Sequence, residues 1–336
     1  MLKRIIIFIL VLLVAAGAGY YFWYLPQQTE EITIDENPNV TRLADPTVIS
    51  PINSLSNNSL WYGLSSGRLM QYDLNDQVAT EYPVPPVIGN SFKKIYWPRQ
   101  GSDFIAISNL EGDEQFSYFN FKEKRYYILP FNITNLDWVN NSAKIAIIWQ
   151  SGDNKTYLVV SNPDATGYKV LRELPWSDMS IKTSPSTNSA LLYRTNSGDE
   201  TTKIYLFDLT TGEYIESVPE GRNTGAVWSP QGDGFAFTRL VNGKNQVYYH
   251  HIASGINTDL KLATGIDKIA FSQDGTKIYL ASLLDDQPKE NIWQYTIPTK
   301  EFITIFSSET MRVKNIIPIG SELYFLNQED ALYSLK

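Results

Sequence analysis

Carboxylates are the residues of this chain best placed to do chemistry, because they crowd five short polar segments. These segments read LEGDEQ (residues 110–115), QSGDNK (150–155), NSGDET (196–201), LDDQPKEN (284–291) and NQEDA (327–331). Two carboxylates across a pocket are what a glycosidase uses, one as acid and the other as base or nucleophile. Carboxylates gathered on one surface also bind divalent cations or attract a basic partner. The segments therefore offer either a catalytic pair, which no motif assigns to particular residues, or a negatively charged binding surface.

The two histidines of the chain, His250 and His251, are adjacent in a segment predicted to be a strand. Neighbouring residues of a strand point to opposite faces, so these side chains cannot share one metal site or one catalytic triad. The sequence contains no G-x-S-x-G, H-E-x-x-H, P-loop or C-x-x-C motif, and no cysteine. The stretch SQDGT, residues 272–276, differs in spacing from the aspartate box of sialidases and is interpreted as a turn. We therefore predict no catalytic residue, no cofactor and no metal site.

The elements that carry these residues belong to a repeat. The phrases YWPRQGSDFIAI, DWVNNSAKIAII, VWSPQGDGFAF and AFSQDGTKIYLA each combine a strand, a tight polar turn and a second strand. The residues just before the turn, counting three weaker copies, are Leu55, Trp97, Trp138, Thr183, Trp228, Phe271 and Ile317. Successive members of this set of anchor residues lie 41 to 46 positions apart. A period of ~40–45 residues holding several short strands marks the blades of a β-propeller.

The repeat predicts an all-β fold, a β-propeller of about seven four-stranded blades. The weak copies at Leu55 and Thr183 leave six or eight blades open. Neighbouring blades must bury each other's faces, which explains why the same apolar pattern recurs. Trp97, Trp138 and Trp228 are therefore expected to fill the space between blades rather than to stack on a ligand.

The last repeat ends at Lys336, after its third strand. The segment NVTRLAD, residues 39–45, has no strand partner upstream and lies where a fourth strand would precede the first blade. We predict that this segment completes the last blade, which closes the ring and removes its open edge.

The loops between the second and third strands of all blades lie on one face of such a ring, so the repeat gathers the acidic segments there. The seven loops hold eleven acidic and four basic residues, whereas the whole chain has 36 against 28. Two tryptophans lie beside this face and could anchor a ligand. The candidate binding rim consists of Asp113, Asp153, Asp199, Asp285, Asp286, Trp149 and Trp176. The alternative interpretation is a set of solvated turns that keep strand edges soluble.

The phrases WSPQGDGFAF and FSQDGTKIYL resemble the repeat of TolB-like propellers, whose consensus runs aromatic-Ser-Pro-Asp-Gly, a spacer and a short apolar strand. The resemblance covers residues 39–336 and is best in these two phrases. The consensus aspartate stands at Asp274 alone, and the proline at Pro98, Pro185 and Pro230. The resemblance implies protein-binding or sensing tasks in the bacterial envelope, and it carries no catalytic residue to this chain.

The N-terminus carries a membrane-spanning pattern. Residues 5–25 contain no charge, and about 20 helical residues span a bilayer. Lys3 and Arg4 keep the N-terminus in the cytoplasm and send the rest of the chain outward. We predict a membrane anchor over residues 1–26, a polar tether over 27–38 and the propeller over 39–336. The alternative is a cleaved signal peptide, and both interpretations export the propeller.

Three functions are compatible with the sequence. The first is a non-catalytic module of the cell envelope that binds a protein, peptide or glycan. The second is a glycan-active hydrolase or lyase with a central carboxylate site, and the third is a structural part of an envelope complex. The net charge of −8 argues against a nucleic-acid partner.

Overall fold

A computed structural model gives the structure of the chain. It describes residues 39–44, 47–56, 59–85, 91–99, 101–110, 113–129, 132–140, 143–194, 201–283 and 289–336. The regular elements of these residues are 28 β-strands and one 3₁₀ turn, η3 (Ile266–Lys268). The predicted all-β fold is therefore confirmed.

The strands form seven antiparallel sheets of four strands each, which we number as blades along the chain. Blade 1 holds β2 (Val48–Ser56), β3 (Ser59–Leu64), β4 (Leu69–Asp73) and β5 (Val78–Tyr82). Blade 2 holds β6 (Lys94–Tyr96), β7 (Phe104–Leu110), β8 (Asp113–Asn120) and β9 (Arg125–Ile128). Blade 3 holds β10 (Ile133–Val139), β11 (Lys144–Gln150), β12 (Thr156–Ser161) and β13 (Lys169–Leu174). Blade 4 holds β14 (Met179–Thr183), β15 (Ser189–Arg194), β16 (Thr202–Asp208) and β17 (Tyr214–Gly221).

The remaining blades continue the same order. Blade 5 holds β18 (Asn223–Trp228), β19 (Gly234–Val241), β20 (Lys244–His251) and β21 (Ile256–Ala263). Blade 6 holds β22 (Ile269–Phe271), β23 (Lys277–Leu283), β24 (Glu290–Thr296) and β25 (Glu301–Ser308). Blade 7 holds β26 (Val313–Ile319), β27 (Glu322–Asn327), β28 (Leu332–Leu335) and the first strand of the chain, β1 (Val40–Ala44).

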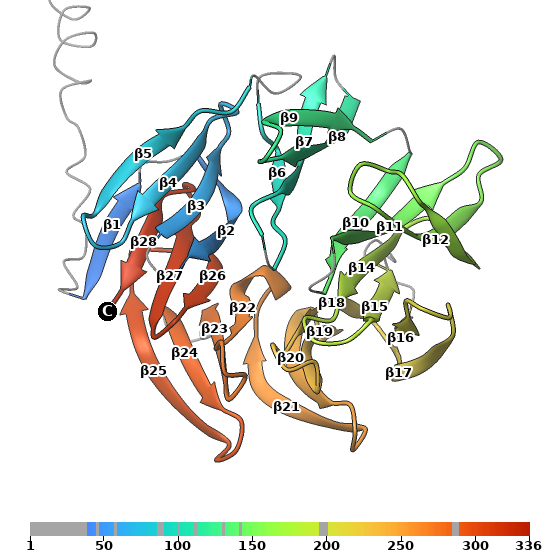
Figure 1. Cartoon of the computed structure of the whole chain (residues 1–336). Helices are drawn as coiled ribbons and strands as arrows, with labels where there is room; N and C mark the ends of the chain where they lie inside the picture. Colours follow the sequence, from blue (N-terminus) through green and yellow to red (C-terminus); the bar gives the residue numbers. More distant parts are fainter. Residues whose placement is uncertain are drawn as a thin grey trace, which may run out of the picture. The chain divides into compact units, whose positions relative to one another are not determined.

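The seven sheets stand side by side around a common axis and form a β-propeller (Figure 1). The first strand of each blade lies nearest the axis, and we call these strands the inner wall. The fourth strand lies at the periphery, as β5, β21 and β25 show in Figure 1. The predicted number of seven blades is thus confirmed, and the alternatives of six and eight are excluded.

Blade 7 is completed by the N-terminal end of the propeller, as predicted. β1 pairs antiparallel with β28, and Val40 lies opposite Leu335 in this pairing. The backbone N–H of Lys336 also donates to the carbonyl oxygen of Asn39 over 3.0 Å. Figure 1 accordingly marks the C-terminus beside β1. The two ends of the propeller thus share one sheet, which closes the ring.

The recurring tryptophans pack between blades. Trp138 and Trp228 are buried, and each indole N–H donates over 2.8 Å to a backbone carbonyl of the preceding blade. The acceptors, Tyr96 and Lys182, occupy the same position, directly before the anchor residue of their own repeat. Each tryptophan therefore satisfies an acceptor on the free edge of the neighbouring inner strand while it fills the gap between two sheets.

The segment of residues 272–276 is a tight turn, as predicted. Gly275 has a φ of 69°, in the left-handed region that favours glycine. The Asp274 carboxylate accepts hydrogen bonds from the Ser272 hydroxyl at 2.6 Å and from the Thr276 hydroxyl at 2.9 Å. The bond from Ser272 is the main cause of a lowered pKa of Asp274. The carboxylate is thus occupied in stabilising the turn.

The predicted anchor and tether, residues 1–38, lie outside the residues that the structure describes. From residue 39 onward, no described helix has the length and apolar character needed to cross a bilayer.

Candidate functional site

A cavity of about 750 Å³, which we call the central cavity, extends from the inner strands outward between blades 7 and 1 on the face that carries the tight turns between the first and second strands. We call this the turn face. The cavity is lined by β1, by the turn between β4 and β5, and by β26 with the turn that follows it. Its described lining includes Thr41, Leu43, Tyr72, Leu74, Asn75, Gln77, Arg99, Pro230, Phe271, Gln273, Ile317, Pro318, Ile319, Ser321, Glu322, Ser334 and Lys336. Residues from both ends of the propeller and from five blades thus form one site.

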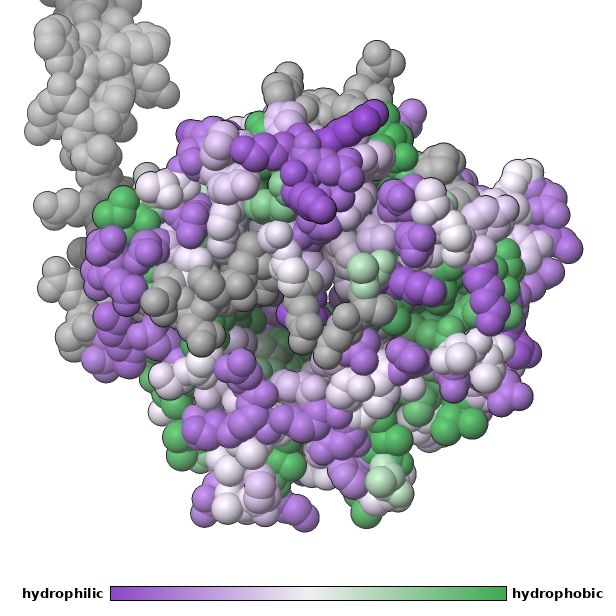
Figure 2. Space-filling view, viewed as in Figure 1, coloured by the Kyte–Doolittle hydropathy of each residue, from purple (hydrophilic) through white to green (hydrophobic). Residues whose placement is uncertain are grey.

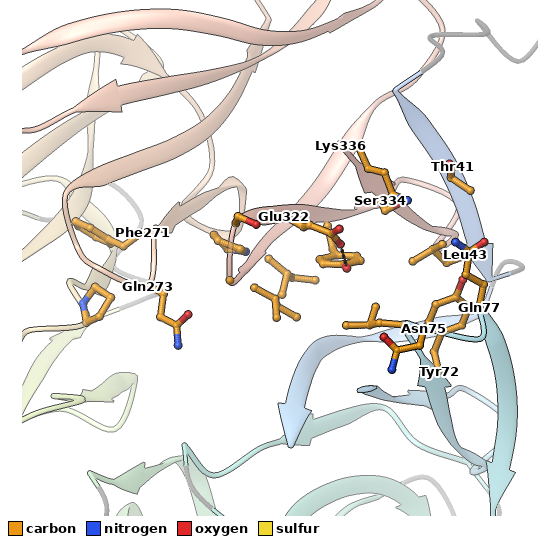
Figure 3. A pocket seen from close by; sticks show the side chains of 18 of the residues that line it. Thr41, Leu43, Tyr72, Asn75, Gln77, Phe271, Gln273, Glu322, Ser334 and Lys336 are labelled. Carbon is orange, nitrogen blue, oxygen red and sulfur yellow. Dashed lines mark hydrogen bonds between the residues drawn. The ribbon is translucent and has the colours of Figure 1, made fainter. Parts of the chain in front are cut away.

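Amide and hydroxyl groups share the lining of this cavity with apolar side chains. Figure 3 shows Phe271 and Gln273 on one side, Asn75 and Gln77 on the other, and Glu322 between them. The three amide side chains are exposed, so their donors and acceptors are free to face a ligand. Such a lining suits a polar, hydroxyl-rich molecule that also offers apolar surface.

Glu322 is the single Asp or Glu among the described residues that line the cavity. Its carboxylate accepts a hydrogen bond from the hydroxyl of Tyr324. Burial and this hydrogen bond raise the pKa of Tyr324, so the phenol stays protonated near neutral pH. Hydrolysis of a glycoside by the usual route needs two carboxylates across the substrate, and this lining contributes one.

Arg99 connects the cavity to the inner wall. Its guanidinium donates to the Trp138 carbonyl oxygen at 3.1 Å and to the Thr183 hydroxyl oxygen at 2.9 Å. Since Arg99 follows β6, it joins the ends of three consecutive inner strands, β6, β10 and β14. This residue therefore supports the mouth of the cavity through backbone and hydroxyl contacts.

The inner wall differs between the two halves of the ring. In six blades, the residue directly before the anchor residue pairs with the second strand of its blade in the same register. In blades 2 to 7 this residue is, in order, Tyr96, Asp137, Lys182, Val227, Ala270 and Ile316. Blades 2–4 thus supply polar and charged side chains at this level, and blades 5–7 supply apolar ones.

Two lysines dominate the electrostatics of the polar half. Burial, and then repulsion by Lys182, lower the pKa of Lys94. Burial also opposes the charged form of Lys182, but attraction by Tyr193, Asp137 and Asp267 outweighs it and raises the pKa of Lys182. The Asp137 carboxylate accepts the Thr183 backbone N–H at 2.8 Å. Lys94, Asp137 and Lys182, on the inner strands of three consecutive blades, therefore interact electrostatically across the inner wall.

The residues of the predicted rim lie where the repeat places them, so far as the structure describes them. Asp113 begins β8 and Asp153 lies in the turn after β11, both exposed. Trp149 ends β11, and Trp176 lies between β13 and β14. All four lie on the face opposite the turn face, which we call the loop face. Asp199, Asp285 and Asp286 lie outside the described residues.

The two rim tryptophans already have neighbours. Trp149 is half-buried and packs against Tyr157, with ring centres 5.6 Å apart. Trp176 is 37% exposed, and the Arg194 guanidinium lies 5.4 Å from its ring centre. Trp176 is therefore the more accessible of the two as a ligand contact.

Lysines on the loop face pair with several of its acidic residues. Lys93 forms an ion pair with Glu114, and Lys314 forms one with Asp330. Lys93 lies just before β6 and Lys314 is the second residue of β26, so neither belongs to the loops between second and third strands. Their ion pairs reduce the excess of negative charge on this face.

Glu290 belongs to the interior and not to the loop face surface. Its side chain is completely buried, and its carboxylate accepts from Lys268 Nζ at 2.6 Å and from the Val313 backbone N–H at 2.8 Å. These contacts link blade 6 to the inner strand of blade 7. This acidic residue of the fourth polar segment therefore stabilises the ring.

The side chains of the two histidines make separate contacts, as expected for adjacent residues of one strand. His250 is buried and makes hydrogen-bond contacts with Ser217 Oγ at 3.1 Å and Asn257 Oδ1 at 2.8 Å. Burial is the main cause of its lowered pKa. His251 instead contacts Ser254 Oγ at 3.0 Å in the following turn. Across the described residues, no group of three or more His, Asp or Glu side chains is placed to hold a metal ion.

The central cavity is the site that the sequence reasoning missed. Its amides come from turns in different blades, and turns rich in Asn, Gln and Gly look alike wherever they occur. One pattern was readable: aligned on the anchor residues, the preceding position is Tyr96, Asp137 and Lys182 in blades 2–4 but apolar in blades 5–7. That asymmetry distinguishes one side of the ring.

Comparisons with known proteins identify the fold of this chain, a β-propeller, through solved structures. No family model matches the sequence, and no curated protein matches it significantly. Many solved structures share the fold. An oligogalacturonate lyase in complex with manganese has a TM-score of 0.64 at 12% identity, covering 88% of this chain and 92% of its own.

Two further structures are similar in the same way. The oligogalacturonate lyase of Vibrio parahaemolyticus has a TM-score of 0.64 at 11% identity, covering 88% of this chain and 92% of its own. The acylaminoacyl peptidase of Pyrococcus horikoshii has a TM-score of 0.59 at 13% identity, covering 87% of this chain and 51% of its own. At such identities the similarity establishes the seven-bladed fold and carries no function.

Proposed function

We propose that this chain is a non-catalytic binding module of the cell envelope whose central cavity binds a glycan. The observation that carries the proposal is a cavity of about 750 Å³ whose lining combines amide and hydroxyl groups with apolar side chains. Sugars present hydroxyl groups around their rim and C–H groups on their faces, so they match both parts of this lining. Asn75, Gln77 and Gln273 bind the hydroxyl groups, and the partly exposed side chains of Pro230, Pro318 and Ile319 contact the sugar face.

The distribution of apolar side chains favours a polar ligand over a broad protein contact. The exposed large apolar residues include one on the outer strand of each of blades 1–6, namely Val78, Ile128, Val170, Ile215, Ile256 and Ile303. On the face shown in Figure 2, apolar residues accordingly form separate patches near the margin. A protein partner bound through the hydrophobic effect would need one continuous patch.

The binding proposal predicts that the amides of the cavity govern affinity. The double variant Asn75→Ala/Gln273→Ala is expected to bind neutral oligosaccharides about tenfold more weakly, since two hydrogen bonds are lost at ~0.5–1.5 kcal/mol each. Isothermal titration calorimetry with soluble chito-, cello- and galacto-oligosaccharides measures this. Both residues are exposed, so the melting temperature should not change.

A matched control for the cavity variant lies on the opposite face. Asp113→Asn/Asp153→Asn changes two rim residues and should leave oligosaccharide affinity as it is. If the rim variant binds oligosaccharides more weakly and the cavity variant binds them normally, the glycan site lies on the acidic rim and not in the cavity. Absence of binding by all three oligosaccharide series would reject a neutral-glycan module.

An enzymatic alternative rests on a separate observation, the lowered pKa of Lys94. Lowering the pKa of a lysine amine makes its neutral form more accessible, and the neutral amine is the form that accepts a proton as the base of a β-elimination. Two of the structural neighbours are named oligogalacturonate lyases. Incubation with oligogalacturonate distinguishes the alternatives, because elimination creates unsaturated ends that absorb ultraviolet light. Binding without new absorbance supports the module, and new absorbance that Lys94→Met abolishes supports the lyase.

We also propose export and membrane attachment through residues 5–25, with the propeller outside the cytoplasm. The support is the uncharged apolar run behind Lys3 and Arg4, together with the resemblance to TolB-like envelope propellers. Alkaline phosphatase, which is active only outside the cytoplasm, is expected to be active when fused after Lys336. If a reporter that works only in the cytoplasm is active when fused at the same position, the proposal of export is contradicted. Retention in the membrane fraction after alkaline extraction distinguishes an anchor from a cleaved signal peptide.

A further inference from the structure

Two lysines of the inner wall have no anionic partner among the described residues. Lys94 of β6 and Lys182 of β14 are both half-buried. In the part of the chain that the structure describes, neither ammonium group donates a hydrogen bond or forms an ion pair. Lys94 Nζ lies over the ring of Tyr96, 4.4 Å from its centre. A half-buried ammonium group without an ion-pair partner costs free energy, so its retention at two positions of the inner wall, on either side of blade 3, needs a reason.

The acidic residues near the two lysines are engaged elsewhere. Asp137 accepts the Thr183 backbone N–H at 2.8 Å and lies 4.0 Å from the Arg99 guanidinium. Glu114 is paired with Lys93. Asp267 acts on both lysines but makes no ion pair with either within the described residues. The acids therefore moderate the repulsion between the lysines and leave their N–H groups unoccupied.

The local charges do not balance. The groups that act on one another here are the cations Lys94, Lys182 and Arg99 and the carboxylates Asp137, Asp267 and Glu114, and Lys93 pairs with Glu114. Four positive against three negative charges leave one positive charge. A monovalent anion neutralises this excess, whereas a phosphate dianion would exceed it.

We propose that the inner wall of blades 2–4 binds one carboxylate group between Lys94 and Lys182, with the hydroxyl of Tyr96 as a further donor. Burial and the nearby Asp137 carboxylate raise the pKa of Tyr96, so its phenol keeps the proton that it donates. Ammonium and hydroxyl donors to a carboxylate form short, charge-assisted hydrogen bonds. The carboxylate belongs either to a sugar acid or to a small free acid, and the chemistry of the site is the same for both. The site is independent of the amides that bind neutral sugars in the cavity.

The test is titration calorimetry of the exported propeller with four compounds. Galacturonate and acetate carry a carboxylate, galactose is the neutral counterpart of galacturonate, and inorganic phosphate is the competing anion. Galacturonate is expected to bind and galactose to bind at least tenfold more weakly. Equal affinity for acetate assigns the site to small free acids, and preference for galacturonate assigns it to sugar acids.

Two variants locate the site. Lys94→Met and Lys182→Met keep most of the apolar volume of the side chain and remove the charge, and each should weaken galacturonate binding at least tenfold. Without ligand, Lys94→Met should melt at or above the temperature of the unchanged protein, because burial and repulsion by Lys182 both disfavour the charge of Lys94. Lys144→Met, on the exposed end of β11, is the matched control and should bind normally.

The proposal is overturned by any of three results. One is that no carboxylate binds, another is that phosphate binds while carboxylates do not, and the third is that both lysine variants bind as the unchanged protein does. A lower melting temperature of the variants together with absent carboxylate binding assigns the lysines a purely structural role. If the protein binds carboxylates but no neutral sugar, the result contradicts the proposed glycan site in the cavity and leaves the carboxylate site supported.

Discussion

Glu290→Ala is expected to destabilise the propeller far more than loss of an exposed acidic residue does. The Glu290 carboxylate is completely buried, holds Lys268 Nζ at 2.6 Å and accepts the Val313 backbone N–H at 2.8 Å. Removal of one partner of a buried ion pair leaves the other charge uncompensated, which costs about 3–5 kcal/mol. We therefore expect a loss of that size in the free energy of unfolding, measured by urea denaturation.

Two controls make the expectation specific. Glu309→Ala removes an ion pair with Lys289 in which both side chains are about half exposed, and it should cost less than about 1 kcal/mol. The double variant Lys268→Met/Glu290→Leu removes both charges and should recover part of the stability. If Glu290→Ala unfolds at the same urea concentration as Glu309→Ala, the buried link does not stabilise the ring.

Removal of residues 39–45 is expected to open the ring. A protein that begins at Pro46 lacks β1, so the edge of β28 loses its partner. Several backbone hydrogen bonds disappear, and so does the packing of Val40 and Leu43 against two apolar clusters. At ~1 kcal/mol per hydrogen bond, the loss is roughly 3–5 kcal/mol, and the exposed edge favours aggregation.

The comparison is with a protein that begins at Thr29, which keeps β1 and lacks the apolar N-terminal run. The shortened protein should melt roughly 10 °C lower, since a loss of 1 kcal/mol moves the midpoint of a large domain by ~2–4 °C. A synthetic peptide of residues 38–46 added in excess should restore part of the difference by pairing with β28. Identical melting of the two proteins would show that β1 adds nothing to the closed ring.

The repeat made the fold predictable because its evidence is local. Each turn phrase identifies its own blade, and the missing strand after Leu335 indicated that residues 39–45 complete the sheet. Contacts between blades were harder to infer, because their partners come from different repeats. Glu290 appeared to be one more loop carboxylate, since nothing in the sequence near it indicates that Lys268 and the backbone of Val313 surround it.

The candidate site was predictable only in part. The rim residues Asp113 and Asp153 are exposed on the expected face, and their role in binding stays a prediction. Lys93, just before β6, and Lys314, the second residue of β26, pair with Glu114 and Asp330 on that face and reduce its excess of negative charge. The central cavity stayed hidden because Asn75 and Gln273 are brought together only by closure of the ring.

Pairing of β1 with β28 sets the order in which the chain completes its fold. β1 is the first strand of the propeller in the chain, and its partner β28 is the last. During synthesis, blades 1–6 can form while β1 is still unpaired. The ring closes only when β28 is present, and this closure carries the loop entropy of nearly the whole domain. A propeller that lacks β28 would keep an open seventh blade, so closure of the ring depends on its last strand.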